Sequence, residues 1–214
     1  MFTIDFINPY ITYIIYISLF MGLALWMAFF PKQVRKHKRL VFLGFFTLIS
    51  YSQIVRYLIP WLTEGTINYP FFVSRLAALL MLVYFIFKIR ALHAILYFWT
   101  ATGILAVFVP MGSPAHMDIL PETFLIDHFV AGVFPLYLLI VKDYTPSCKE
   151  AHIYALVLLI IFVVYIPFAQ HYGWNYFFMH DDNILFDIFP TLNWYMFALL
   201  KAFGLWIYFL GCVN

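Results

Sequence analysis

The sequence predicts an all-α membrane protein, a bundle of seven transmembrane helices with its N-terminus outside and its C-terminus in the cytoplasm. Of its 214 residues, 65% are hydrophobic and only 10% are charged, whereas a soluble domain has roughly 25% charged residues. The mean hydropathy of +0.93 excludes a soluble globule as well. Nine of the twelve Lys and Arg residues lie in short connections between apolar runs, and three lie inside the runs.

Seven apolar stretches are long enough to cross a bilayer, which takes roughly 17–25 residues per helix. In chain order they are Tyr10–Phe30, Leu40–Leu62, Tyr69–Phe87, Ala91–Pro110, Phe124–Val141, Ala151–Ala169 and Phe189–Leu210. No basic segment precedes the first stretch, so it is predicted to be a true helix rather than a cleaved signal peptide. No internal repeat or soluble segment interrupts the series, and residues 1–214 are predicted to form a single domain.

The connections between the stretches alternate in charge. The first connection has the sequence PKQVRKHKR, and the third and fifth also contain Lys or Arg. The second, fourth and sixth contain Asp or Glu but no Lys or Arg. Because cytoplasmic loops carry the excess of Lys and Arg, the odd-numbered connections are predicted to face the cytoplasm of a plasma or inner membrane. The formal net charge of +2 gives no argument for binding nucleic acid.

Three cations lie inside apolar stretches, namely Arg56, Arg75 and Lys201. An ionisable side chain within a membrane span marks a candidate functional site. From the helical rise, Arg56 and Arg75 lie within about 10 Å of the outer surface, and Lys201 lies about 18 Å deep. The nearest candidate partners for these cations are Asp127 and His128. The role of Lys201 stays open at this stage.

Most of the intramembrane polar residues share one depth, in the outer half of the bundle. They predict an outward-facing pocket for a phospholipid-like substrate, in which two guanidinium groups hold a phosphate. Simpler roles compete with this one, because an arginine can extend its guanidinium to the outer phosphates and a serine can bond to its own helix. The candidate substrate-binding residues are Arg56, Arg75, Gln53, Asp127, Asn175, Tyr176, Tyr195 and Lys201.

Two of those candidates, Asn175 and Tyr176, belong to the sixth connection, which has the sequence HYGWNYFFMHDDNILFD. Its many aromatic residues predict a lid that lies at the membrane interface over the outer polar layer. The His-Asp-Asp run follows no recognised metal-ligand spacing. No metal site and no cofactor are therefore predicted. The predicted partners are membrane lipids.

Scattered motifs between residues 69 and 196 resemble a known family. They are Tyr69-Pro70-Phe71-Phe72-Val73-Ser74, Tyr97-Phe98-Trp99 with Gly103, Pro110, His128, Gly173-Trp174-Asn175-Tyr176 and Trp194-Tyr195. In these motifs the chain is similar to the YwaF-like bacterial integral membrane proteins, which are related to the eukaryotic transmembrane protein 164 family. The resemblance implies a seven-helix, acyltransferase-like fold that acts on phospholipid acyl chains.

The resemblance also implies catalytic residues. In the eukaryotic relatives a cysteine carries the acyl group and a histidine assists. Aligned on the proline, the family pattern Leu-Pro-Leu-His-Leu-Cys puts Ser74 at the cysteine and Phe72 at the first histidine. Ser74 is then the implied nucleophile and His128 the implied base, and a serine depends on such a base more than a thiolate does.

Three other functions are open to a chain of this composition. A lipid-binding or hydrophobic-peptide-binding accessory or receptor protein would need the pocket but no catalysis. A small-solute transporter should carry polar residues from one membrane face to the other, whereas here they concentrate in the outer half. A retinal protein would need a carboxylate to compensate a Schiff base on Lys201, and the third stretch offers none.

Overall fold

The structure of the protein is a computed structural model, which describes residues 9–65, 73–108, 121–172 and 193–213. Within these ranges the regular secondary structure is entirely helical. The elements are α1 (Pro9–Phe29), α2 (Pro31–Lys36), α3 (Lys38–Gln53), η1 (Ile54–Leu58), α4 (Ile59–Glu64), α5 (Val73–Phe87), α6 (Leu92–Phe108), α8 (Pro121–Val141), α9 (Cys148–Tyr172) and α11 (Trp194–Gly211).

Each of the seven predicted apolar stretches falls on a helix, and α3, η1 and α4 together cover the second of them. Three described segments are long and apolar enough to span a membrane: Lys38–Glu64, Cys148–Phe168 and Trp194–Gly211. The helices also expose large aliphatic side chains, such as Leu19 and Leu156, with 59% and 56% of their surface accessible. Because these surfaces suit hydrocarbon rather than water, the fold is that of a helical membrane protein.

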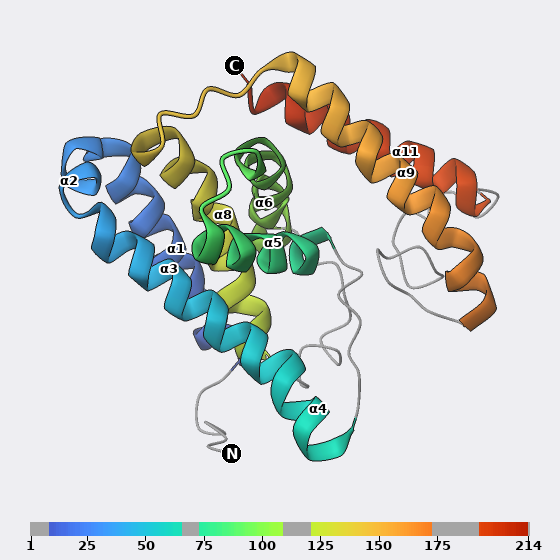
Figure 1. The fold of residues 1–214 in the computed structure, drawn as a ribbon, viewed down its shortest axis with the longest axis horizontal. Coiled ribbons are helices and arrows are strands. Elements are labelled where there is room, and N and C mark those ends of the chain that lie inside the picture. Colours follow the sequence, from blue (N-terminus) through green and yellow to red (C-terminus); the bar gives the residue numbers. More distant parts are fainter. Residues whose placement is uncertain (1–8, 66–72, 109–120, 173–192, 214) are drawn as a thin grey trace.

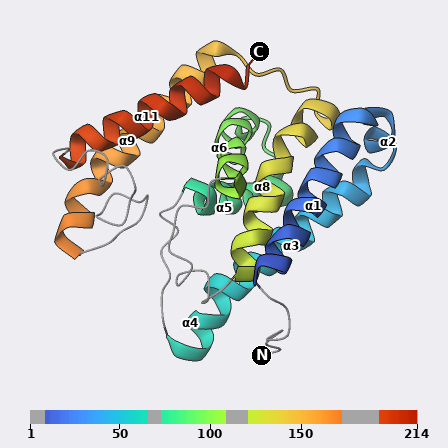
Figure 2. The same ribbon diagram turned by 180° about the vertical axis from the view of Figure 1, so that it is seen from behind.

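The helices form two groups, which Figures 1 and 2 show from opposite sides. Helices α1, α3, α5, α6 and α8 gather in one group, and α8 packs against the other four. Helices α9 and α11 lie side by side and extend away from that group in both views. The first group therefore contains the buried centre of the molecule, and α8 runs through it.

Aromatic rings fill the space between α3, α5 and α8. Phe134 on α8 contacts Phe85 and Tyr84 of α5 at centroid distances of 5.5 and 5.8 Å, and Phe45 of α3 at 6.1 Å. These pairs have edge-to-face geometry, which aligns the positive ring edges with the negative faces. Their packing fixes the position of α8 relative to the two neighbouring helices.

A close backbone approach joins α6 to α8. A Cβ atom on Gly103 of α6 would lie 2.9 Å from the Cβ of Ala131 and 3.0 Å from the backbone nitrogen of Gly132. Only a glycine fits at that distance, as is common where helices pack within membranes. The small residues on both helices explain why α6 and α8 form the most extensive helix pair of the fold.

The α9–α11 pair meets the rest of the molecule through α6. Tyr97 of α6 donates a hydrogen bond to the carbonyl of Cys212 at 2.7 Å, and Tyr208 of α11 donates one to the carbonyl of Ala101, also at 2.7 Å. The rings of Phe98 on α6 and Phe209 on α11 also pack against each other, with centroids 5.2 Å apart. The C-terminal end of α11 is thus held against α6, while the start of α11 extends away from it (Figure 1).

Candidate functional site

A buried carboxylate on α8 is the centre of the polar residues. Asp127 has only 1% of its surface exposed. Its Oδ1 accepts hydrogen bonds from the hydroxyl of Ser52 and, at 3.2 Å, from Nε2 of Gln53. Its Oδ2 accepts from the Arg56 guanidinium, with which it forms an ion pair. Both carboxylate oxygens are therefore engaged by the helix that contains α3 and η1.

Arg56 is held from two sides. Besides its ion pair with Asp127, its Nη2 donates to the hydroxyl of Thr123 at 3.0 Å. Thr123 lies four residues before Asp127, hence on the same face of α8. The Arg56 side chain is 7% exposed, so the guanidinium is fixed by hydrogen bonds in a nearly closed environment. We call Ser52, Gln53, Arg56, Thr123 and Asp127 the Asp127 cluster.

The sequence predicts these contacts in part. Ser52 and Gln53 lie four and three residues before Arg56, so the three share one helical face. The structure agrees, because all three contact Asp127. Asp127 and His128 are the candidate partners that the sequence predicts for the three cations within the apolar stretches, and the structure pairs Arg56 with Asp127.

The helix widens at Arg56 into the π-helical segment η1. Within η1 the backbone N–H of Ile59 bonds to the carbonyl of Ile54, five residues earlier. Pro60 explains the change of register, because proline has no N–H to offer the carbonyl of Arg56, and its ring would collide with that carbonyl in a regular α-helix. Such π-segments often occur at functional sites. The predicted second helix is therefore continuous in length but irregular at its central arginine.

Arg75 and Tyr57 lie next to the cluster. The guanidinium of Arg75 is close enough to interact electrostatically with Asp127 and with the Tyr57 hydroxyl. Tyr57 follows Arg56 in η1, and its hydroxyl oxygen is buried. The charge of Arg75 on α5 therefore acts on the same carboxylate as that of Arg56.

The implied catalytic residues flank this arrangement. His128 follows Asp127 on α8 and is 6% exposed, and Ser74 is half-buried in the first turn of α5, directly before Arg75. The Asp127 carboxylate accepts hydrogen bonds from Arg56, Ser52 and Gln53. In addition, adjacent residues on a helix point about 100° apart. Asp127 therefore positions Arg56, rather than orienting the His128 imidazole as the acid of a catalytic triad would.

One buried acceptor in the cluster lacks a partner within the described residues. The Oε1 atom of Gln53 is shielded from solvent and accepts no hydrogen bond there, although Nε2 of the same amide donates to Asp127. A buried carbonyl oxygen without a donor is costly unless water or a ligand satisfies it. The cluster therefore offers an acceptor as well as guanidinium donors.

The remaining candidates do not join the cluster. Tyr195 and Lys201 belong to α11, which lies apart from α3 and from the N-terminal half of α8 in both views (Figures 1 and 2). Lys201 is half-buried, and its ammonium nitrogen lies 4.9 Å from the centroid of the Phe197 ring. Asn175 and Tyr176 lie outside the described residues.

Sequence reasoning missed Thr123 and Tyr57. Thr123 precedes the predicted start of the fifth apolar stretch at Phe124, but α8 begins two residues before it, at Pro121. Proline is favoured in the first turn of a helix, and that signal could have moved the predicted start outward. Pro60 lies four residues after Arg56 and cannot donate a hydrogen bond to its carbonyl. This position could likewise have predicted the irregular helical segment that contains Tyr57.

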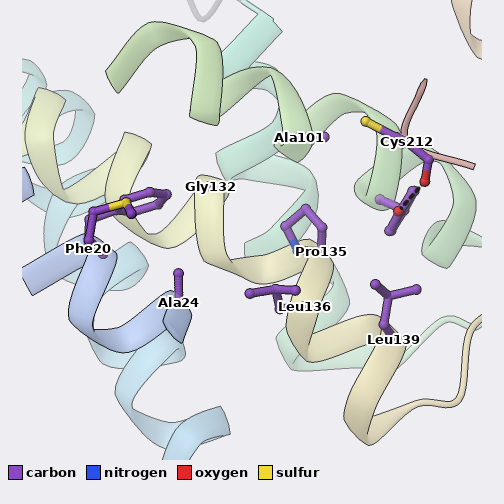
Figure 3. A pocket seen from close by; sticks show the side chains of 10 residues that line it. Phe20, Ala24, Ala101, Gly132, Pro135, Leu136, Leu139 and Cys212 are labelled. Atoms are coloured by element: carbon purple, nitrogen blue, oxygen red, sulfur yellow. Dashed lines mark hydrogen bonds between the residues drawn. The ribbon is translucent and has the colours of Figure 1, made fainter. Parts of the chain in front are cut away.

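A separate cavity of about 370 Å³ lies between α1, α6, α8 and the end of α11 (Figure 3). Its walls come from residues such as Phe20, Ala101, Pro135 and Leu139, with Cys212 at one side. No charged side chain is among its lining residues. This cavity therefore offers almost entirely apolar surface, in contrast to the polar Asp127 cluster.

The fold and the cluster together define a helical membrane protein with a buried Arg–Asp pair between two of its helices. The sequence model of the TMEM164 family matches residues 6–212, which is nearly the whole chain. This chain belongs to the TMEM164 family. The match confirms the resemblance to the transmembrane protein 164 family, while the narrower YwaF-like assignment stays a prediction. No curated protein and no solved structure matches the chain.

Proposed function

We propose that this protein binds a phospholipid-like substrate at the Asp127 cluster and acts on its acyl ester, by transfer or by hydrolysis. The observation that carries the proposal is the Arg56 guanidinium, which is buried and held by Asp127 and Thr123. A buried cation is costly in a membrane, where apolar residues would pack without that cost. A role in recognition gives a reason for the charge.

The chemistry of the cluster suits a phospholipid headgroup. A guanidinium presents several N–H donors in a planar fork that matches phosphate oxygens. Arg75 adds a second guanidinium at the same end of α8. The Oε1 of Gln53, which has no partner among the described residues, can accept a hydrogen bond from a hydroxyl or amino group of the same ligand. These groups support recognition of a polar, phosphate-bearing head.

In the proposed reaction, Ser74 Oγ attacks the acyl carbonyl and His128 accepts the hydroxyl proton. The ester C–O bond then breaks, and the lyso-lipid leaves after its oxygen regains that proton from His128. The acyl group passes from Ser74 to a second alcohol or to water. Family membership and the position of Ser74 directly before Arg75 support this assignment.

The proposal includes a topology. All seven helical segments cross a plasma or inner membrane as one domain, with the N-terminus outside and the C-terminus in the cytoplasm. The arrangement of loop cations supports it, because Arg35, Lys88 and Lys142 follow alternate predicted spans. The Asp127 cluster then faces the outer leaflet, and membrane lipids are the partners. Tyr195 and Lys201 are left out of the site because α11 lies apart from it.

A non-catalytic lipid-binding protein is the second candidate, and one observation favours it. The Ser74 hydroxyl forms no hydrogen bond to His128 or to another side chain within the part of the chain that the structure describes. A serine nucleophile needs a base within hydrogen-bond reach to be activated. In this alternative the headgroup binds at Arg56 and Arg75, and no ester bond is broken.

Lipid analysis of cells that express the protein separates the two candidates. An enzyme should alter the acyl composition of at least one phospholipid class, and Ser74→Ala and His128→Ala should each abolish that change. The matched controls are Ser50→Ala on α3 and His152→Ala on α9, which lie outside the cluster and should act like the wild type. Folding is checked by the unfolding temperature of each purified variant.

A binding protein gives a different pattern. The purified protein should then retain phospholipid, Arg56→Gln should reduce the amount retained, and Ser74→Ala should leave it unchanged. Lipid profiles that do not change with wild-type protein would contradict the enzymatic proposal. Phospholipid retention equal in Arg56→Gln and wild type would contradict both candidates.

A further inference from the structure

Three lysines converge at the end of the helix bundle opposite the Asp127 cluster. Lys38 begins α3, Lys88 follows α5, and Lys142 follows α8. Lys142 lies 15 residues after Asp127 on the axis of α8, which corresponds to about 22 Å. Lys38 lies one helical turn before Phe42 on α3, the residue whose ring Lys88 approaches, and both lysine charges repel Lys142. Partial desolvation and this repulsion lower the pKa of Lys142.

Aromatic rings lie beneath the ammonium groups of two of these lysines. The ammonium nitrogen of Lys88 lies 6.0 Å from the centroid of the Phe42 ring, and that of Lys142 lies 6.0 Å from the centroid of Tyr84. Phe85 packs against both rings, at centroid distances of 5.1 and 5.8 Å. Since each lysine extends over a ring at the limit of a cation–π contact, the two charges are held above one continuous aromatic surface.

The nearby acidic groups do not neutralise the three lysines. Within the described residues none of the three ammonium groups forms an ion pair. Asp143, next to Lys142, pairs with Arg35 at 2.6 Å. Glu150 accepts hydrogen bonds from Ser147 and from the hydroxyl of Tyr144. The three lysine charges are therefore not neutralised by Asp143 or Glu150, because these carboxylates bind Arg35, Ser147 and Tyr144.

The backbone at Lys88 adopts a conformation that is unfavourable for a residue with a side chain. Lys88 has a φ of 54°, in the left-handed region, directly after the last residue of α5. Glycine ends helices in this conformation at lower cost because it has no Cβ atom. A lysine at this position accepts a conformational cost and places a cation above Phe42.

We propose that Lys38, Lys88 and Lys142 form a binding site for the phosphate of an anionic lipid headgroup, in the leaflet at this end of the bundle. A phosphate lowers the mutual repulsion of the three ammonium groups and accepts their hydrogen bonds. The exposed side chain of Phe87 meets the lipid below the headgroup. This site is independent of the proposed activity, which belongs to the other end of α8.

Native mass spectrometry of the full chain in neutral detergent tests the site. The probes are dihexanoyl-phosphatidylglycerol, dihexanoyl-phosphatidylcholine and inorganic phosphate. Phosphatidylglycerol should bind in preference to phosphatidylcholine. Lys88→Gln and Lys142→Gln should each weaken its binding about fivefold, the effect expected for one lysine near an anionic lipid. Lys88→Arg and Lys142→Arg keep the charge and should keep most of the binding.

The matched controls are Lys36→Gln in α2 and Lys149→Gln in α9, two exposed lysines outside the trio. Wild-type affinity in both controls supports a defined site. An equal loss in the controls would indicate diffuse surface charge and overturn the proposal, as would equal binding of phosphatidylglycerol and phosphatidylcholine. If inorganic phosphate binds as tightly as phosphatidylglycerol, the site recognises free phosphate and not a lipid headgroup, and the proposal is overturned.

Discussion

Arg56 and Asp127 form an ion pair across two helices in which the side chains are only 7% and 1% exposed. The pair joins the π-segment η1 to the N-terminal half of α8. Neither charge reaches bulk solvent, so each depends on the other and on the surrounding hydrogen bonds for its stability. Arg56 therefore has a fixed orientation, which a cation that binds a headgroup needs.

Removal of Asp127 should destabilise the protein strongly. Asp127→Ala leaves a buried guanidinium without its carboxylate, and breaking such a pair costs about 3–5 kcal/mol. The measurement is the free energy of unfolding in mixed detergent micelles. The control is Asp143→Asn, which removes the Arg35–Asp143 pair, whose side chains are 58% and 72% exposed. Exposed pairs contribute about 0–1 kcal/mol, so this variant should stay close to wild type.

Replacement of both charged residues tests whether stability returns when neither charge is left buried without its partner. The double variant Arg56→Met/Asp127→Leu removes the desolvation cost along with the attraction, and it should recover most of the stability lost in Asp127→Ala. Phospholipid retention should nevertheless stay low, because the guanidinium is gone. Equal unfolding free energies for Asp127→Ala and Asp143→Asn would show that the Arg56–Asp127 pair is not buried as described.

Thr123 should contribute through its hydroxyl alone. Thr123→Val keeps the shape of the side chain and removes the acceptor that Arg56 Nη2 contacts at 3.0 Å. A hydrogen bond to a charged group contributes about 1.5–3 kcal/mol, which is the expected loss of unfolding free energy. Thr63→Val is the control, because Thr63 is exposed and bonds only to a carbonyl of its own helix. A loss no greater than in Thr63→Val would mean that Thr123 does not hold Arg56.

The sequence predicts the helices of this fold well, because each span is a continuous apolar run bounded by polar residues. It also predicts that Arg56 has its partner on another helix, since a charge deep in an apolar run needs one. Depth estimates from the helical rise put Asp127 within reach. Helix length and charge therefore indicate which polar residues of different helices lie at similar heights along the bundle.

The lateral arrangement of the helices could not be predicted in the same way. Apolar helices expose similar surfaces on all sides, so composition does not show which neighbours they choose. Tyr195 has a suitable depth for the outer polar layer, yet it lies on α11, which extends away from α3 and α8. Depth without lateral position brought Tyr195 into one predicted site with Arg56.

Gly103 should be intolerant of even a methyl group. In Gly103→Ala the new Cβ would meet Ala131 and the backbone of Gly132 at 2.9 and 3.0 Å, so α6 and α8 would have to separate. Overpacking of this kind costs about 1–3 kcal/mol. Alanine gains up to about 1 kcal/mol in helix propensity, which offsets only part of that loss. The expected result is a lower unfolding temperature.

The matched control for Gly103 is Gly204→Ala on α11. A Cβ atom at Gly204 would have no neighbour within 4 Å, so only the gain in helix propensity applies. This variant should unfold at the same temperature as wild type or slightly higher. If Gly103→Ala unfolds at the same temperature as Gly204→Ala, α6 and α8 do not approach each other as closely as described.

The docking of α11 on α6 should depend on two tyrosine hydroxyls. Tyr97→Phe and Tyr208→Phe each remove one hydrogen bond between a hydroxyl and a backbone carbonyl across this interface. Each bond contributes about 1 kcal/mol, so each variant should open the interface about fivefold more often, and the double variant should exceed either single one. Tyr51→Phe on the exposed face of α3 is the control.

Cys212 reports this opening directly, because it is half-buried beside Tyr97 while Cys148 is exposed. Maleimide labelling followed by mass spectrometry gives the rate at Cys212, with Cys148 of the same molecule as the internal reference. The ratio of the two rates should rise about fivefold in each single variant and stay at the wild-type value in Tyr51→Phe. A ratio that stays constant in the double variant would mean that ring packing between Phe98 and Phe209, rather than the hydroxyl groups, holds α11 in place.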